Sequence, residues 1–343
     1  MSQIPVTDSE AQESAAPSNT APSGSLTLGG RCFFKNAMVY RLPADFALSS
    51  LELEQLLRAR PLLDCGPLEE VRNGWVNCSP LGRTVHTVNG QHLIALGTHK
   101  KILPASAIRE ECAKRALRLA EEQGAPVGRR QKRELKEKVR TELLAKALVR
   151  TIVTRAWIDT VNGWLVVEAS GAARAERLVS ELREVLGSFA VGLLEAEQAP
   201  SFTMASWLRA GGASHRLTLD TDLELQSPDK ATVRYARHTL EGEDIKKHLA
   251  EGKVVTRLGL TWNDQIAFVL TGKLELKRIA FLALDTASEG EEKPEEPSAE
   301  ELFDADLLLM SDSLSEMLED LSEALGITGK PETSNAEEAP AAG

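Results

Sequence analysis

Apolar residues recur along the chain with two spacings, one typical of strands and one typical of helices. Segments that are largely apolar, or that alternate polar and apolar residues, predict half-buried strands. These predicted strands are 33–42, 188–197, 215–226, 230–240, 253–262, 265–272 and 274–284. The last three follow one another closely, which predicts an antiparallel meander.

Two Asn-Gly pairs predict tight hairpin turns. Asn89-Gly90 and Asn162-Gly163 each stand between two strand-like runs. Both central residues of such a turn adopt positive φ angles, which Asn and Gly tolerate best. The shared sequence TVNG is either the trace of a duplicated hairpin or the coincidence of two good turns.

Helical spacing predicts seven helices, some with recognisable ends. The segments are 49–60, 104–123, 129–151, 171–187, 201–211, 241–252 and 302–326. A serine is expected to cap the first, while Gly124 and Gly187 are expected to end the second and fourth. The predicted helix 129–151 would be about 33 Å long.

These elements predict an α+β fold with mainly antiparallel sheets. The helices 104–123 and 129–151 lie between two predicted hairpins, so we expect them to project as an inserted arm. The expected divisions are a disordered extension (1–30), a first α+β part of the body (31–103), a basic helical arm (104–151), a second α+β part (152–285), and an acidic linker, C-terminal helix and disordered tail (286–343).

Charge is distributed unevenly along the chain. The net charge is -11, but residues 286–343 contain 17 acidic residues and two lysines. Residues 31–285 contain 38 basic and 31 acidic residues, so the expected body is mildly basic. Such asymmetry suggests a polyanionic partner, and the acidic end either competes with that partner or aids solubility.

The strongest single signal is the basic segment from Arg129 to Arg155, with ten Lys or Arg against three Glu. Arg129, Arg133, Lys136 and Arg140 recur at helical spacing and share one face. A parallel apolar stripe is formed by Leu135, Val139, Leu143 and Ala147. A row of cations on a rigid helix suits a phosphate backbone. The alternative is a solvated helix with Glu–Lys pairs such as Glu134–Lys138.

A second basic group follows on the predicted strand 230–240. Arg234, Tyr235, Arg237 and His238 lie close together, and strand alternation would point Tyr235 and Arg237 to the same side. Lys246, Lys247, His248, Lys253 and Arg257 follow. The sequence has no zinc-finger spacing, no RNA-recognition pattern and no zipper, so any nucleic-acid binding is expected to be largely indifferent to sequence.

Motifs for catalysis, cofactors or metals are scarce. The sequence has no phosphate-binding loop, no zinc-protease motif and no nucleophile elbow, so we expect neither cofactor nor metal. Asp220–Asp222 and Asp304–Asp306 have a spacing that can hold a metal ion, although a solvated face is the simpler interpretation. His92 is expected to be structural or exposed. With no signal peptide and no long apolar run, the chain is expected to be cytoplasmic, without a membrane partner.

Several short stretches together resemble one known family. FFKNAMVYRL, GWV, VNGQ, KILP, WIDTVNG, LGS, GKVVT and FDAD occur in order between Arg31 and Gly326. In this order and spacing the chain resembles the bacterial recombination-associated protein RdgC family. WIDTVNG and KILP together are specific; no single short match would be.

The resemblance implies a non-catalytic DNA-binding protein that forms a ring-shaped homodimer. The family's ring has a positively charged hole wide enough for a duplex, and binding shows little sequence preference. The family is nucleoid-associated and restrains the RecA recombinase. Double-stranded DNA is the implied ligand, and single-stranded DNA remains open as a second one.

The resemblance also assigns roles to particular residues. Lys146 and Lys253 stand at basic family positions, and Arg237-His238 replaces a Lys-Gln pair. Leu148 replaces a phenylalanine that grips the partner subunit, so it is the expected dimer gate without the aromatic ring. The predicted DNA-binding set is Arg129, Arg130, Lys132, Arg133, Lys136, Arg140, Lys146, Arg150, Arg237, His238 and Lys253.

Three functions therefore stand as hypotheses. The first is a ring-forming duplex-binding protein that limits RecA access to DNA. The second is a metal-dependent nuclease using Asp220, Asp222 or Asp304. The third is a protein-interaction module that binds through apolar residues of the C-terminal helix, namely Leu307, Leu308, Leu314, Met317, Leu318 and Leu321; packing of this helix on its own body is the alternative.

Overall fold

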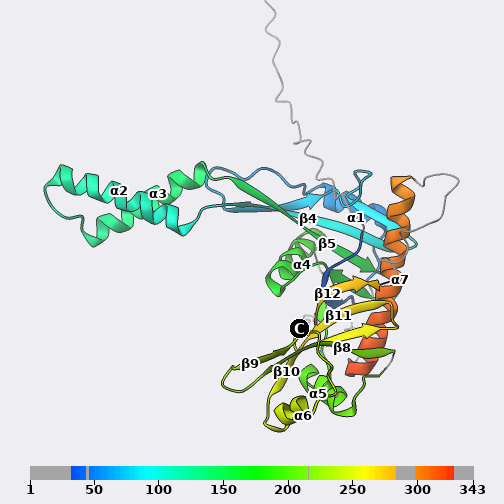
Figure 1. Ribbon diagram of the computed structural model, residues 1–343. Helices are drawn as coiled ribbons and strands as arrows, with labels where there is room; N and C mark the ends of the chain where they lie inside the picture. The colour runs from blue at the N-terminus through cyan, green and yellow to red at the C-terminus, as the bar shows by residue number, and fades with distance from the viewer. Residues whose placement is uncertain (1–31, 44–45, 188, 215, 283–297, 328–343) are drawn as a thin grey trace, which may run out of the picture.

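The structure is a computed structural model that describes residues 32–43, 46–187, 189–214, 216–282 and 298–327. The predicted disordered extension (1–30) lies outside these residues, as do most of the acidic linker and the tail after residue 327. Figure 1 shows the described part as one body with a long helical projection.

The described strands form one sheet. They are β1 Asn36–Arg41, β2 Val71–Val76, β3 Val85–Val88, β4 Gln91–Lys101, β5 Val149–Asp159, β6 Trp164–Val167, β7 Gly192–Leu193, β8 Leu217–Gln226, β9 Thr232–Tyr235, β10 Val254–Trp262, β11 Ile266–Thr271 and β12 Glu275–Phe281. Their order is β2-β4-β5-β6-β1-β12-β11-β10-β8-β9, with β3 beside β4 and β7 beside β1. Neighbouring strands are antiparallel, so the predicted α+β class and the meander β10-β11-β12 are confirmed.

Strand β1 joins the two halves of the sheet. Met38 is paired with Val167 of β6 on one side and with Glu275 of β12 on the other. Ala37 and Val39 belong to one apolar cluster, and Met38 and Tyr40 to a second one. Because successive side chains of a strand point to opposite faces, these are the two faces of the sheet.

Helices cover both faces of the sheet. The helices in the described residues are α1 Ser50–Arg58, α2 Ala105–Gln123, α3 Arg129–Ala145, α4 Ala172–Leu186, α5 Pro200–Ala210, α6 Glu243–Ala250 and α7 Ala299–Leu325. The buried residues of α1 and α4 belong to the same cluster as Met38, and those of α5, α6 and α7 to the cluster of Val39. Of the leucines expected on one face of α1, only Leu53 and Leu57 are buried.

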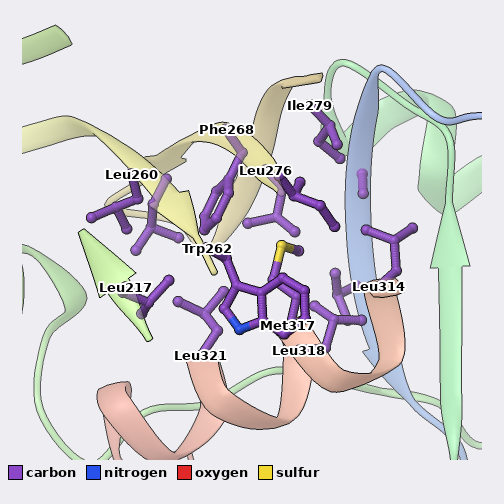
Figure 2. Packing of buried hydrophobic residues seen from close by; sticks show 14 of the residues in the cluster. Leu217, Leu260, Trp262, Phe268, Leu276, Ile279, Leu314, Met317, Leu318 and Leu321 are labelled. Carbon is purple, nitrogen blue, oxygen red and sulfur yellow. The ribbon is translucent and has the colours of Figure 1, made fainter. Parts of the chain in front are cut away.

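The C-terminal helix α7 packs along the sheet. It begins at Ser298, which shares a capping box with Glu301. Figure 2 shows Leu314, Met317, Leu318 and Leu321 of α7 in one apolar cluster with Trp262 and other core residues of the meander. The apolar face that the third hypothesis offered to a partner protein is therefore covered by this chain's own sheet, and that hypothesis was wrong in its choice of face.

The helices α2 and α3 form an antiparallel hairpin that extends away from the sheet (Figure 1). Gly124 ends α2 in the left-handed conformation, as predicted. Strand β4 leads into α2 and strand β5 leaves α3, and these two strands pair along their whole length. The helical hairpin therefore starts and ends at the same end of the β4–β5 ladder, where Lys101 pairs with Val149.

Several predicted boundaries were wrong. The helix predicted for 129–151 ends at Ala145, because Val149–Asp159 pairs with β4 instead. Its 17 residues span about 26 Å rather than 33 Å. The strand predicted at 188–197 is reduced to Gly192–Leu193, and β2 was not predicted.

The two Asn-Gly turns also differ from each other. Asn89 and Gly90 both have positive φ angles, as predicted for a tight turn. Of the second pair only Gly163 has a positive φ angle, and that turn spans residues 160–163. It is held by the buried Asp159 carboxylate, which accepts hydrogen bonds from the backbone N–H groups of Val161 and Asn162.

Candidate nucleic-acid interface

The basic row predicted from the sequence lies on the exposed side of α3. Arg129, Arg133, Lys136 and Arg140 are all exposed, at spacings of four, three and four residues. Val139, on the adjacent side of the helix, is completely buried. Of the predicted apolar stripe only Val139 is buried, and Leu135, Leu143 and Ala147 are half-buried, while the cations remain in water.

Ion pairing divides the cations of α3 into two groups. Arg130 pairs with Glu134 one turn along, and Arg140 pairs with Glu70 at the base of the hairpin. Within the described residues, Arg129, Lys132, Arg133, Lys136 and Lys138 form no ion pair. Five cations of α3 thus have no counter-charge in the described part of the chain, and the four on or beside the basic row favour an anionic ligand.

Three predicted residues lie beyond the end of α3. Lys146 caps the helix and is exposed, and Arg150 lies in β5 opposite Lys100 of β4. Leu148 is 78% exposed, and its carbonyl oxygen accepts a hydrogen bond from the N–H of Ile102. Arg150 therefore does not lie on the helix predicted for 129–151, since the backbone changes to strand before it.

The second predicted group lies at the other end of the sheet. Strand β9 ends at Tyr235, and Arg237 has a positive φ angle of 53°. The prediction that strand alternation points Tyr235 and Arg237 to the same side was therefore wrong, because Arg237 lies outside the strand. The ring of His238 lies 5.3 Å from that of Tyr235. Nδ1 of His238 is 2.7 Å from the carbonyl oxygen of Thr239, which fixes the ring.

Lys253 is held more firmly than its neighbours in this group. Its ammonium lies 2.7 Å from Nδ1 of His248 and 2.8 Å from a carboxylate oxygen of Glu251. The hydrogen bond from Lys253 is also the main reason why the pKa of Glu251 is lowered. Lys253 is thus already partly neutralised, whereas Arg237 forms no ion pair with any described residue.

The predicted residues therefore form two separate groups. One lies on the α2–α3 hairpin and the other beside β9 and α6. In Figure 1 the hairpin and the ends of β9 and β10 extend to the same side of α7, with α4 between them.

A cavity on the sheet brings Arg234 and Arg257 of the second basic group together with Lys277 and Arg278, which the sequence pattern did not single out. It has a volume of about 170 Å³ and is lined in part by Arg234, Arg257, Lys277 and Arg278. Its acids pair internally: Asp222 lies 2.8 Å from Arg278, and Glu224 pairs with Arg234. Asp222 and Glu224, two residues apart on β8, were the available signal, but the arginines that pair with them lie on or beside other strands.

The Glu224 carboxylate in this cavity is stabilised in its ionised form. Burial opposes its ionisation, but hydrogen bonds from Thr256 and Arg234 outweigh burial, and the pKa of Glu224 is lowered. Asp222 and Glu224 thus neutralise only part of the positive charge of the four cations that line the cavity.

The aspartates considered as metal ligands have other contacts. Asp222 pairs with Arg278, and a carboxylate oxygen of Asp304 lies 2.6 Å from Nε2 of His86. Within the described ranges, no group of three or more His, Cys, Asp or Glu side chains is arranged to hold a metal ion. His92 is buried and is hydrogen-bonded to Thr87, in agreement with the structural role expected for it.

Comparison with known proteins assigns the family. A family model described as "Putative exonuclease, RdgC" matches residues 32–328. The chain belongs to the RdgC family. The match includes the α2–α3 hairpin, the β9–α6 region and α7, and it agrees with the range of the resemblance seen in the sequence.

Curated RdgC proteins are similar over nearly their whole length. A recombination-associated protein RdgC from Herminiimonas arsenicoxydans is 42% identical over 296 residues, which cover 86% of this chain and 98% of that protein. The proteins of the same name from Janthinobacterium sp. (strain Marseille) and Dechloromonas aromatica are 41% and 40% identical, covering 98% and 97% of their lengths. In the part of the chain that the structure describes, no helix is both long enough and apolar enough to cross a bilayer.

Proposed function

We propose that this RdgC-family protein is a non-catalytic DNA-binding protein that cradles or encircles a duplex with little regard to sequence. The observation that carries the proposal is that Arg129, Lys132, Arg133 and Lys136 are exposed on α3 and form no ion pair with any described residue. Cations of this kind bind phosphates and release counterions, which is a sequence-independent source of affinity.

Two groups of cations on one body suit a long, evenly charged ligand. In the proposal, the α3 row and the group around Arg237 bind the backbone of one duplex at two places. Arg130, Arg140, Lys146, Arg150, His238 and Lys253 contribute to the same surface, with Arg130, Arg140 and Lys253 weakened by their acidic partners. Backbone contacts position a protein on DNA but do not read its bases.

The proposed assembly is a homodimer. Leu148 is the proposed gate, because a side chain that is 78% exposed presents apolar surface that the described part of the chain leaves uncovered. Two copies that meet at such contacts would enclose the duplex as a ring. The protein would then limit RecA-dependent recombination by occupying DNA, and it would be found in the cytoplasm on the nucleoid.

The test compares a short random duplex with a duplex analogue that has an uncharged backbone. Tight binding of the charged duplex, with binding of the neutral analogue weaker by at least about a hundredfold, is expected because the affinity comes from phosphates. Equal affinity for the two ligands would contradict the proposal. In the same preparation, prebound protein is expected to slow assembly of RecA on the DNA.

A second candidate, an exonuclease, follows from the description of the matching family model. The pairing of Asp222 with Arg278 and of Asp304 with His86 leaves this candidate weaker, because a metal ion would have to displace both partners. Prolonged incubation of end-labelled DNA with the protein and Mg²⁺ or Mn²⁺ decides between the two. Intact DNA supports binding alone, and stepwise shortening that is lost in the Asp222→Asn or Asp304→Asn variant would establish the nuclease.

A further inference from the structure

The outward face of α7 carries a continuous seam. Side chains alternately three and four residues apart form one line along this face: Leu302, Ala305, Leu309, Asp312, Glu316, Glu319 and Glu323. Leu302 is 50% exposed and Leu309 is 47% exposed, although most of the other leucines of the helix are buried. The seam is therefore apolar over its first three positions and acidic over its last four.

The basic row of α3 matches this seam in length. Asp312 to Glu323 and Arg129 to Arg140 each cover eleven residue steps, or about 16 Å of helix. Beyond the basic row the chain also becomes apolar, because Leu148 is 78% exposed and Val149 is 45% exposed. Each surface thus has a charged half next to an apolar half. The charged half is basic on α3 and acidic on α7, and the apolar half follows the charges after α3 but precedes them on α7.

We propose that α3 of one copy docks antiparallel on the seam of α7 of a second copy. In this orientation Arg129 faces Glu323, Arg133 and Lys136 face Glu319 and Glu316, and the apolar ends lie together. The positive N-terminal end of α3 then lies near the negative C-terminal end of α7, which adds a favourable dipole interaction.

The contact has to form between copies. Figure 1 shows the α2–α3 hairpin extending on one side of the body and α7 lying along the other. Each copy carries both surfaces, so the contact is head-to-tail and can continue from copy to copy. The proposal goes beyond DNA binding, because it requires no nucleic acid, and DNA and α7 would compete for the same cations.

Some of the charge in both rows is already engaged within the chain. Arg140 pairs with Glu70, and Glu316 lies 3.3 Å from Arg216. The contact therefore depends mainly on Arg129, Arg133 and Lys136 on α3 and on Asp312 and Glu319 on α7. These five side chains are all exposed, so their substitution leaves the core untouched.

The test is the mass of the full chain, freed of nucleic acid by nuclease treatment, measured by light scattering over a range of concentrations. At low salt the mass is expected to rise with concentration and to fall back when salt is added, because exposed pairs are screened. Arg133→Glu with Lys136→Glu, or Asp312→Lys with Glu319→Lys, is expected to weaken the association at least about tenfold.

Mixing the two reversed variants is the decisive step. The acidic α3 of one variant then matches the basic α7 of the other, so the rise in mass is expected to return. Arg118→Glu with Lys138→Glu is the matched control, because these two exposed residues have the same charge but lie off the row. Identical mass curves for the wild type and both reversed variants, or a mixture that fails to associate, would overturn the proposal; circular dichroism checks that the helices are intact.

Discussion

Nε2 of His86, on β3, lies 2.6 Å from a carboxylate oxygen of Asp304, on α7. His86 is almost completely buried, and one turn before Asp304 on the same helix Glu300 pairs with Arg83. The start of α7 is therefore attached to the edge of the sheet at two points. Asp304, a candidate metal ligand in the sequence, serves here to anchor the helix.

The first prediction concerns the contribution of α7 to stability. Leu314 is 1% exposed in the core, so Leu314→Ala is expected to lower the free energy of unfolding by about 2–5 kcal/mol. Leu309→Ala, on the exposed side of the same helix, is expected to change it by less than about 0.5 kcal/mol. Urea denaturation compares them, and equal losses would show that α7 is not packed as described.

The second prediction concerns pH. Burial lowers the pKa of His92, and the nearby Asp159 only partly opposes this shift. Below about pH 6.5 the unfolded chain takes up a proton at this residue that the folded chain binds only at lower pH. The unfolded state therefore binds more protons, and stability is expected to fall as the pH falls through this range.

The variant His92→Gln isolates this effect, because all other titrating groups are shared. The denaturation midpoint of the wild type is expected to decline more steeply between about pH 7 and pH 5 than that of the variant. Parallel curves for the two proteins would contradict the prediction.

A third prediction compares how much two cations of the β9–α6 region, Arg237 and Lys253, contribute to duplex binding. Arg237→Gln is expected to weaken duplex binding several-fold and to reduce the salt slope by about 0.9, the value for one phosphate contact. Lys253→Gln is expected to have a smaller effect, because His248 and Glu251 already hold the ammonium. Arg58→Gln on α1 is the control, and a larger loss for Lys253→Gln would contradict the proposed roles.

A fourth prediction concerns Leu148 as the dimer gate. Leu148→Asp is expected to weaken dimerisation by at least about tenfold, because a charge would be buried at the contact. Leu148→Phe is expected to strengthen it by adding apolar area. Sedimentation at high salt measures the dimer while the proposed α3–α7 contact is screened, and unchanged curves for both variants would remove Leu148 from the interface.

Local chemistry explains which parts of the fold were predictable. The turn at Asn89-Gly90 and the end of α2 at Gly124 depend on positive φ angles, which those residues supply themselves. The end of α3 was not predictable in the same way. Whether residues 149–151 continue a helix or begin a strand is decided by pairing with β4, about fifty residues earlier in the chain.

In the candidate interface, too, features set by local sequence were predictable and features set by residues remote in the chain were not. Helical spacing alone placed Arg129, Arg133 and Lys136 on one exposed face. Their neighbour Arg140 was predicted to be equally available, but Glu70, seventy residues away, neutralises it. Arg237 was misplaced because β9 ends at Tyr235, before it, and because Arg237 has a positive φ angle rather than the extended backbone of a regular strand.

The most direct test of the central claim is the salt dependence of duplex binding, measured by fluorescence anisotropy for the full chain and for Arg129→Gln/Arg133→Gln/Lys136→Gln. The wild type is expected to show a slope of log affinity against log salt of several units, at about 0.9 per phosphate, and the triple variant a slope smaller by about 2–3. A control with Arg118→Gln and Lys138→Gln is expected to retain most of the slope. A flat slope for the wild type, or the same slope for the wild type and the triple variant, would contradict the account.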